Sequence, residues 1–249
     1  MSLIDYQNEL LGWVPRLPLP LATKLINRAY RDIRESRPWS FLLKETAITV
    51  PDSVATGTCI VTQYSDQVTG DAVASAAWFG LANPLLTLRQ FRAPNGPIYN
   101  IIVADFTNPA AVVLTLDRIF QESTNAAAAY MIYQCYYPAP DSNFLRWVSI
   151  LDTINGYRFR PDCLFKTKAE IDRVDPYRAS FGSAYWLASY KLGTVGTDVN
   201  VPFFEFWPHV SAKQSFQCLY QTRGADLTLA TDIIPPQVPE AVLNFRARY

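Results

Sequence analysis

Residues 25–43 read LINRAYRDIRESRPWSFLL, and they contain a helix, its end and an aromatic segment that must be buried. Pro38 predicts the end of the helix, because the residue before a proline is disfavoured in the α region. Trp39 and the apolar residues after it then need a surface to pack against. The segment holds no catalytic residue, so it indicates an element of assembly. The helix itself is predicted by apolar residues at helical spacing, which are Ala22, Leu25, Ile26, Ala29, Tyr30 and Ile33.

The opposite face of this helix is polar and rich in arginine. Arg28 and Arg31 each lie four residues before an acid, in the weaker orientation for such ion pairs, so a solvated face is one interpretation. The other is contact with a neighbouring subunit, because arginine is favoured at interfaces. Trp39 is predicted to be buried, either in the core or as an anchor between subunits. The candidates for a subunit interface are Lys24, Arg28, Arg31, Arg34 and Trp39.

The composition is that of a folded protein without a charge bias. The chain has 249 residues, of which 49% are hydrophobic, and its 22 basic residues balance 22 acidic ones. A protein that grips duplex nucleic acid usually carries a basic surplus, so that function is disfavoured. The longest uncharged run, residues 72–88, contains glycine, asparagine and proline and is a poor candidate for a membrane span.

The cysteines and the N-terminus indicate a reducing compartment. No CxxC pair occurs, and free, largely buried thiols are expected at Cys59, Cys135, Cys163 and Cys218. The first residues lack the basic region of a signal peptide. A soluble cytosolic product is therefore expected.

Secondary-structure signals change along the chain. Short β-like runs divided by turn residues predict a small antiparallel sandwich or barrel, and residues 57–71 predict a hairpin within it. Helices are expected at residues 143–151 and 167–181, the second with a capping box of Thr167 and Glu170. Strands are expected again between residues 183 and 223.

These signals predict an α+β fold, with a helical body built from both chain ends and an inserted antiparallel β module. The N-terminal part of the body is expected at residues 1–43 and the β module at residues 44–140. The C-terminal part is expected at residues 141–249, with a β-hairpin region at residues 183–223.

Motifs for catalysis, metal binding or phosphate binding are missing from the sequence. His209, beside Trp207 and Pro208, is predicted to be a packed loop residue. Glu205 is the acid whose aromatic neighbours could raise its pKa, but strand alternation favours a side chain that faces water. We therefore expect no enzymatic activity, no metal and no cofactor.

Seven segments that span most of the chain carry a family resemblance when taken in order. They are residues 26–43, 61–71, 86–101, 113–118, 133–158, 218–227 and 234–243. This series resembles the adaptor or head-to-tail connector proteins of tailed bacteriophages. Adaptors of this family carry an early helix that ends in a tryptophan-containing segment, and they include head-completion and tail-tubular proteins.

The resemblance implies a ring, commonly of twelve copies, that joins the portal protein to a tail or neck protein. DNA would pass through the channel without sequence-specific binding, and the protein would be made in the host cytoplasm and reside in the neck of the virion, with no membrane contact. The C-terminal segment, residues 239–249, would engage the portal. The portal-docking candidates are Val242, Leu243, Phe245, Arg246, Arg248 and Tyr249.

Other functions remain open alternatives. The β module is larger than in compact adaptors, so another neck component, a stopper or a tail terminator, is one of them. A second is a monomeric protein- or carbohydrate-binding module that uses Tyr185, Trp186 and Trp207 as a platform. A third is a hydrolase that would depend on Glu205 or His209.

Overall fold

The protein has a β-rich fold. Its computed structural model describes residues 1–81, 88–94, 96–159, 166–195, 198–210, 212–229 and 231–238. Of these described residues, 39% lie in strands and 21% in helices. The predicted α+β fold with a helical body and an inserted β module is therefore wrong, because much of residues 141–249 forms strands instead of helices.

The chain divides into two compact units, each assembled from separate stretches. The helical unit comprises Met1–Thr46, Asn143–Val148 and Leu219–Tyr249, and the β unit comprises Ala47–Ser142 and Ser149–Cys218. Within the described part of the chain, no helix is both long and apolar enough to cross a membrane.

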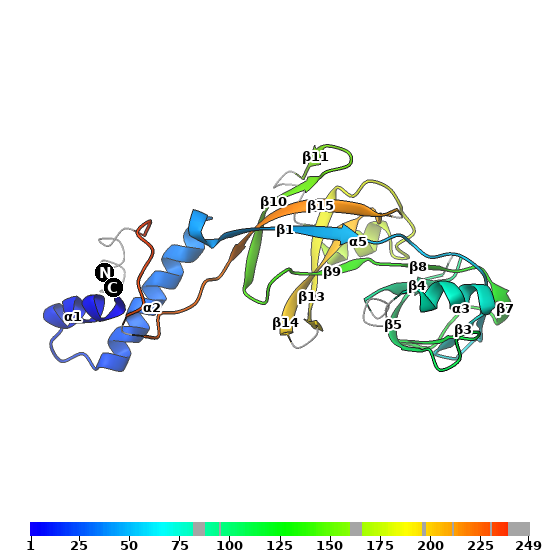
Figure 1. Ribbon diagram of the computed structural model, residues 1–249, viewed down its shortest axis with the longest axis horizontal. Coiled ribbons are helices and arrows are strands. Elements are labelled where there is room, and N and C mark those ends of the chain that lie inside the picture. Colours follow the sequence, from blue (N-terminus) through cyan, green and yellow to red (C-terminus); the bar gives the residue numbers. More distant parts are fainter. Residues whose placement is uncertain are drawn as a thin grey trace. The chain divides into compact units, whose positions relative to one another are not determined.

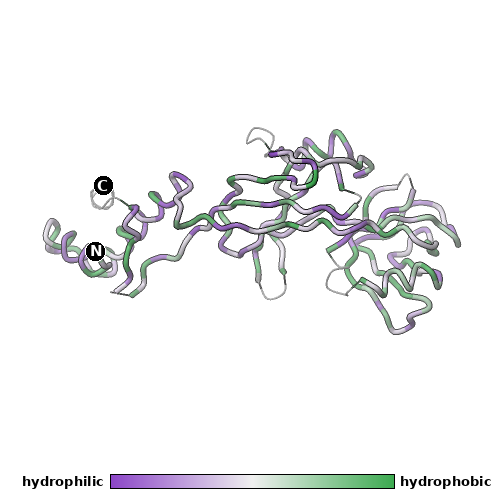
Figure 2. The backbone as a smooth tube through the Cα atoms, turned by 45° about the horizontal axis from the view of Figure 1, so that its top comes forward, coloured by the Kyte–Doolittle hydropathy of each residue, from purple (hydrophilic) through white to green (hydrophobic). Residues whose placement is uncertain are grey.

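The helical unit is built around two helices, α1 (Leu3–Trp13) and α2 (Leu19–Ser36), followed by the short 3-10 helix η1 (Ser40–Leu42) (Figure 1). The predicted helix is confirmed, and α2 ends two residues before Pro38. Hydrophilic and hydrophobic residues alternate along both helices (Figure 2). Their apolar sides share one core with three residues from the C-terminal region, Leu227, Ile234 and Val238.

A seven-stranded sheet forms one part of the β unit. The predicted hairpin is confirmed, with Cys59 opposite Gly70 and Val61 opposite Val68. Helix α3 (Ala72–Phe79) follows it and buries Trp78, whose ring would lie 2.8 Å from a Cβ at Gly70. In sheet order the strands are β7 (Asn125–Ala128), β2 (Cys59–Val61), β3 (Gln67–Gly70), β6 (Val113–Leu116), β5 (Ile98–Asp105), β4 (Gln90–Arg92) and β8 (Met131–Tyr133).

A four-stranded sheet forms a second part of the β unit. Its strands, in order, are β12 (Lys166–Thr167), β13 (Trp186–Val195), β14 (Asp198–Trp207) and β9 (Tyr136–Pro138). The capping box is confirmed, because the Thr167 amide donates to Glu170 at 2.8 Å at the start of α5 (Lys168–Val174). Helix α5 is shorter than the expected helix at residues 167–181, since Pro176 cannot continue it.

A further four-stranded sheet has the order β1 (Leu43–Val50), β15 (Gln214–Thr222), β10 (Phe144–Asp152) and β11 (Tyr157–Arg158). The helix expected at residues 143–151 is wrong, because this segment is β10. Its buried residues Phe144, Trp147 and Ile150 lie three apart, a spacing that resembles helical periodicity. Sheet pairing, which suits its aromatic and β-branched residues, decides the structure here.

Candidate interaction surfaces

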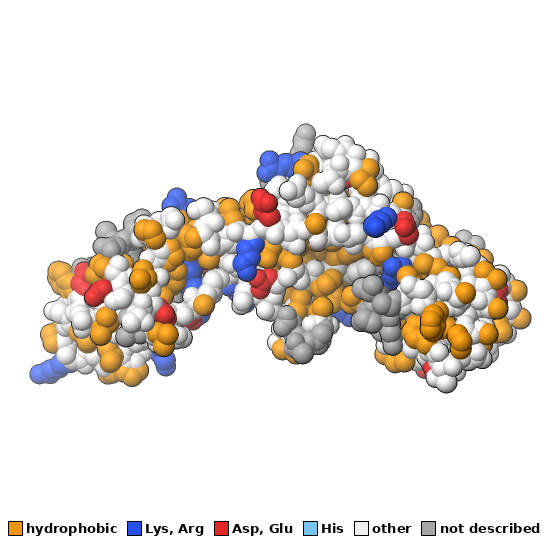
Figure 3. All heavy atoms as spheres, in the orientation of Figure 1, with side chains coloured by type: hydrophobic (Ala, Val, Ile, Leu, Met, Phe, Trp, Pro, Cys, Tyr) orange, Lys and Arg blue, Asp and Glu red, His pale blue; other side chains and the backbone are white. Residues whose placement is uncertain are grey.

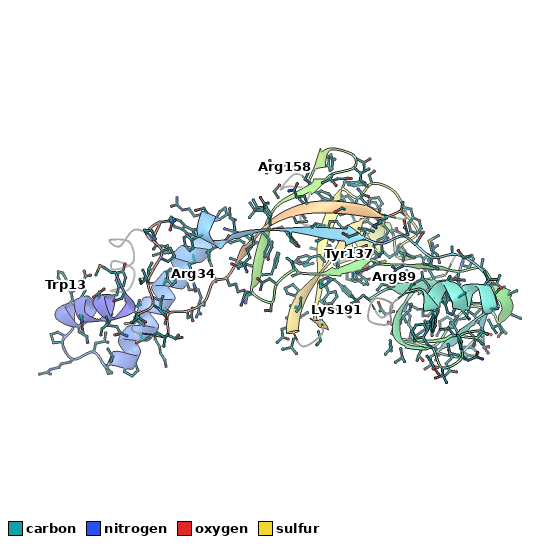
Figure 4. The ribbon with its side chains drawn as sticks, viewed as in Figure 1. Trp13, Arg34, Arg89, Tyr137, Arg158 and Lys191 are labelled. Atoms are coloured by element: carbon teal, nitrogen blue, oxygen red, sulfur yellow. The ribbon has the colours of Figure 1, made fainter. Side chains whose placement is uncertain are left out.

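Apolar side chains are exposed where α1 meets α2. Trp13 is 64% exposed, Leu19 53% and Leu21 44%, and Val14 is exposed as well. Figure 3 shows hydrophobic side chains on the visible face of this unit, and Figure 4 labels Trp13 at α1. Three prolines, at positions 15, 18 and 20, shape the connection between the helices. We call these four exposed residues the apolar tip, and large exposed apolar patches mark interaction sites.

The predicted arginine face of α2 is split by the fold. Lys24 and Arg28 are exposed, and Arg31 donates to Asp226 at 2.6 Å. Arg34 is only 2% exposed; it donates to the other oxygen of Asp226 at 3.0 Å and lies over the Tyr30 ring. Arg34 therefore has intrachain partners, whereas Lys24 and Arg28 remain on the surface.

Trp39 is 8% exposed, which confirms the predicted burial. Its indole N–H donates to the Ile33 carbonyl at 2.8 Å, and the Arg37 guanidinium stacks over the ring. Phe41 packs beside it with ring centroids 6.0 Å apart. These contacts lie within the chain and fix the exit from α2. The six portal-docking candidates, Val242 to Tyr249, lie outside the described residues.

Glu205 lies in the interior of the β unit, so the expectation that it faces water is wrong. It is 0% exposed; it lies on β14, which pairs with β13 and β9, and Arg178 and His209 pack against its carboxylate. Its counter-charge is Arg178, which bonds both carboxylate oxygens and also Asp172. Burial raises the pKa of Glu205, against the lowering effect of its hydrogen bond with Arg178.

His209 packs beside this ion pair, as predicted for a packed residue. It is 1% exposed, and its Nε2 lies 3.7 Å from Glu205 Oε1 without a hydrogen-bond partner among the described residues. Burial lowers the pKa of His209 to about 3, so the imidazole is neutral near pH 7. The ring contacts Tyr133 and Phe181, whose centroids lie 5.7 and 6.5 Å away.

The described cysteines carry no reactive thiolate. Cys59, Cys135 and Cys218 are free and buried, as predicted, and Cys163 lies outside the described residues. Burial raises the pKa of Cys59 and of Cys218 to about 12. Among the residues that the structure describes, no group of three or more potential ligands could hold a metal ion.

The proposed aromatic platform of the binding-module alternative does form a cluster. However, Trp186 and Trp207 stack on each other at 4.6 Å, and Tyr185 meets Trp207 edge-on at 5.4 Å. Trp207 is buried, and its indole N–H donates to Asp175 at 3.1 Å. The ring faces are thus largely engaged by each other.

Two residues that organise these sites were missed in the sequence. Asp226 pairs with two arginines almost 200 positions earlier, and Arg178 adopts a left-handed backbone with φ +53°. Neither lies in a motif, so only the three-dimensional pairing identifies them. Comparison with known protein families, curated proteins and solved structures finds no match for this chain.

Proposed function

We propose that the chain is a structural adaptor that joins the portal vertex of a bacteriophage head to the tail. The observation that carries this proposal is the apolar tip of the helical unit, where Trp13, Leu19 and Leu21 are about half exposed or more. Burial of such side chains by another protein is favourable by roughly 25 cal/mol per Å² of apolar surface. The tip therefore favours a protein that functions in assembly.

The chemistry of the interior supports a non-enzymatic role. Glu205 is held by Arg178, and the chain's single histidine is buried and neutral. A general acid or base must reach the proton that it transfers, and both groups lie in the packed interior of the β unit. The proposed adaptor needs neither a cofactor nor a metal.

The proposed partners follow from the resemblance to phage connectors. Copies of the chain form a ring, commonly of twelve, between the portal protein and a tail or neck protein, and residues 239–249 contact the portal. The balance of 22 basic and 22 acidic residues suits a channel through which DNA slides without sequence-specific binding. The proposed location is the neck of the virion.

A stopper or tail terminator would use the same apolar tip, so these neck components remain alternatives to the adaptor layer. The monomeric binding module is less favoured, because the faces of Trp186 and Trp207 stack on each other. A monomer would also leave the apolar tip exposed to water.

The test replaces Trp13 and Leu21 by serine and measures attachment of the purified chain to portal-bearing heads. A matched control is Ile154→Ser, since Ile154 is 65% exposed but lies in the β unit. The double variant is expected to fold and to lose attachment, while the control attaches normally. Attachment of the double variant with the parent's affinity would remove the apolar tip from the proposal.

A further inference from the structure

A polar trough lies on the helical unit, beside the C-terminal half of α2. Its volume is about 530 Å³, and its lining includes Arg31, Arg34 and Glu35 from α2. Asn143, Arg223 and Asp226 complete the lining. Three separate stretches of the helical unit therefore contribute to one arginine-rich site, here called the arginine trough.

Several contacts hold the arginine trough in shape. Asp226 accepts one hydrogen bond from Arg31 at 2.6 Å and another from Arg34 at 3.0 Å. The backbone N–H of Arg223 donates to the Asn143 carbonyl at 2.8 Å. Gly224 has φ +68°, and a Cβ there would lie 3.0 Å from Arg34 Nη1, so the turn requires glycine.

The charges of the arginine trough do not balance. Three guanidinium groups face two carboxylates, those of Glu35 and Asp226, and Asp226 is already shared by Arg31 and Arg34. Arg223 is exposed, and its side chain has no partner among the described residues. Because a guanidinium presents paired donors that match a carboxylate, the surplus suits one singly charged carboxylate.

We propose that the arginine trough receives an aspartate or glutamate side chain from a second copy of this chain. The inference rests on the proposed ring and names one of its subunit contacts. Exposed carboxylates on the β unit, among them Asp66, Asp105 and Asp117, can supply the matching negative charge from a second copy. In a head-to-tail contact, two different surfaces meet, and repetition of that contact can close a ring. Such a contact would pair the arginine trough of one copy with a carboxylate on the next.

The test reverses one charge of the trough with Arg223→Glu. Self-association is measured by sedimentation and mass photometry, alone and with portal-bearing heads, at low and high ionic strength. The expected result is at least a tenfold weaker self-association, since loss of a paired charge at an interface typically costs that much or more. High salt should weaken self-association of the parent protein and reduce the difference in self-association between parent and variant.

A matched control is Arg158→Glu, because Arg158 is exposed in the β unit, outside the trough (Figure 4). Circular dichroism melting verifies that both variants fold. Arg223→Lys keeps the charge but loses the paired donors, so its self-association should be weakened by an intermediate amount.

Three outcomes would overturn the inference. The first is self-association of Arg223→Glu at the parent's strength. The second is an equal loss of self-association in Arg223→Glu and in the control. The third is that Arg223→Glu loses attachment to heads while its ring stays intact. The third outcome would mean that the trough binds the portal protein and not a second copy of the chain. Failure of the parent chain to form a ring in either setting would instead refute the proposed function.

Discussion

The substitution Glu205→Gln should strongly destabilise the β unit. Glutamine has nearly the same shape, so the change removes a charge without opening a cavity. Arg178, which is 1% exposed, would then lose the ionic character of two hydrogen bonds. Hydrogen bonds to charged groups contribute about 1.5–3 kcal/mol each, and breaking a buried pair costs about 3–5 kcal/mol. We expect the free energy of unfolding to fall by about 3–5 kcal/mol.

Urea unfolding followed by tryptophan fluorescence measures this loss. Asp172→Asn serves as the matched control, because Asp172 also binds Arg178 but its side chain is 44% exposed. Exposed ion pairs contribute about 1 kcal/mol or less, so the control should change little. A loss below about 1 kcal/mol for Glu205→Gln, with an unchanged slope of the transition, would refute the assignment of Glu205 and Arg178 as a stabilising pair.

Because the pKa of His209 is lowered to about 3, the unfolded chain binds the extra proton between pH 3 and about 6.5, and stability falls as pH falls through that window. His209→Phe should remove up to about 1.4 kcal/mol per pH unit of that dependence, measured by urea unfolding between pH 4.5 and 6.5; an unchanged slope would contradict it. Trp39→Ala should cost about 3–5 kcal/mol in urea unfolding, whereas Trp13→Ala should change stability little; equal effects would argue against burial of Trp39 in a core. Arg28→Glu with Arg31→Glu should weaken self-association in a salt-dependent way while the chain stays folded, and assembly at the parent's strength in low and high salt would remove α2 from the interface.

The first helical segment could be predicted because its signals are local. The apolar stripe of α2 and the stop at Pro38 lie within 20 residues, and burial of Trp39 follows from its position after that stop. Helix α1 was not predicted, although Ser2 and Asp5 form a capping box that the sequence contains. Local patterns thus identified α2 and the capping box of α5, but the capping box at Ser2 and Asp5 did not by itself identify α1.

The fold class and the environment of Glu205 depend on distant pairing. Strand β10 looked helical because its buried residues are three apart, and its sheet partners β11 and β15 decide otherwise. Glu205 is buried because Arg178, 27 positions earlier, and His209 pack against its carboxylate, and Arg178 supplies the counter-charge. Asp226 likewise pairs with Arg31 and Arg34, so these two side chains of the predicted arginine face have partners within the chain. No single segment of the sequence contains these pairings.

We propose that this chain forms the ring between portal and tail. Electron cryo-microscopy of portal-bearing heads incubated with the purified chain tests it most directly. We expect a closed ring of copies on the portal, with the apolar tip covered and the arginine trough at a subunit boundary. Bare portals, or single copies bound without contact to one another, would contradict it.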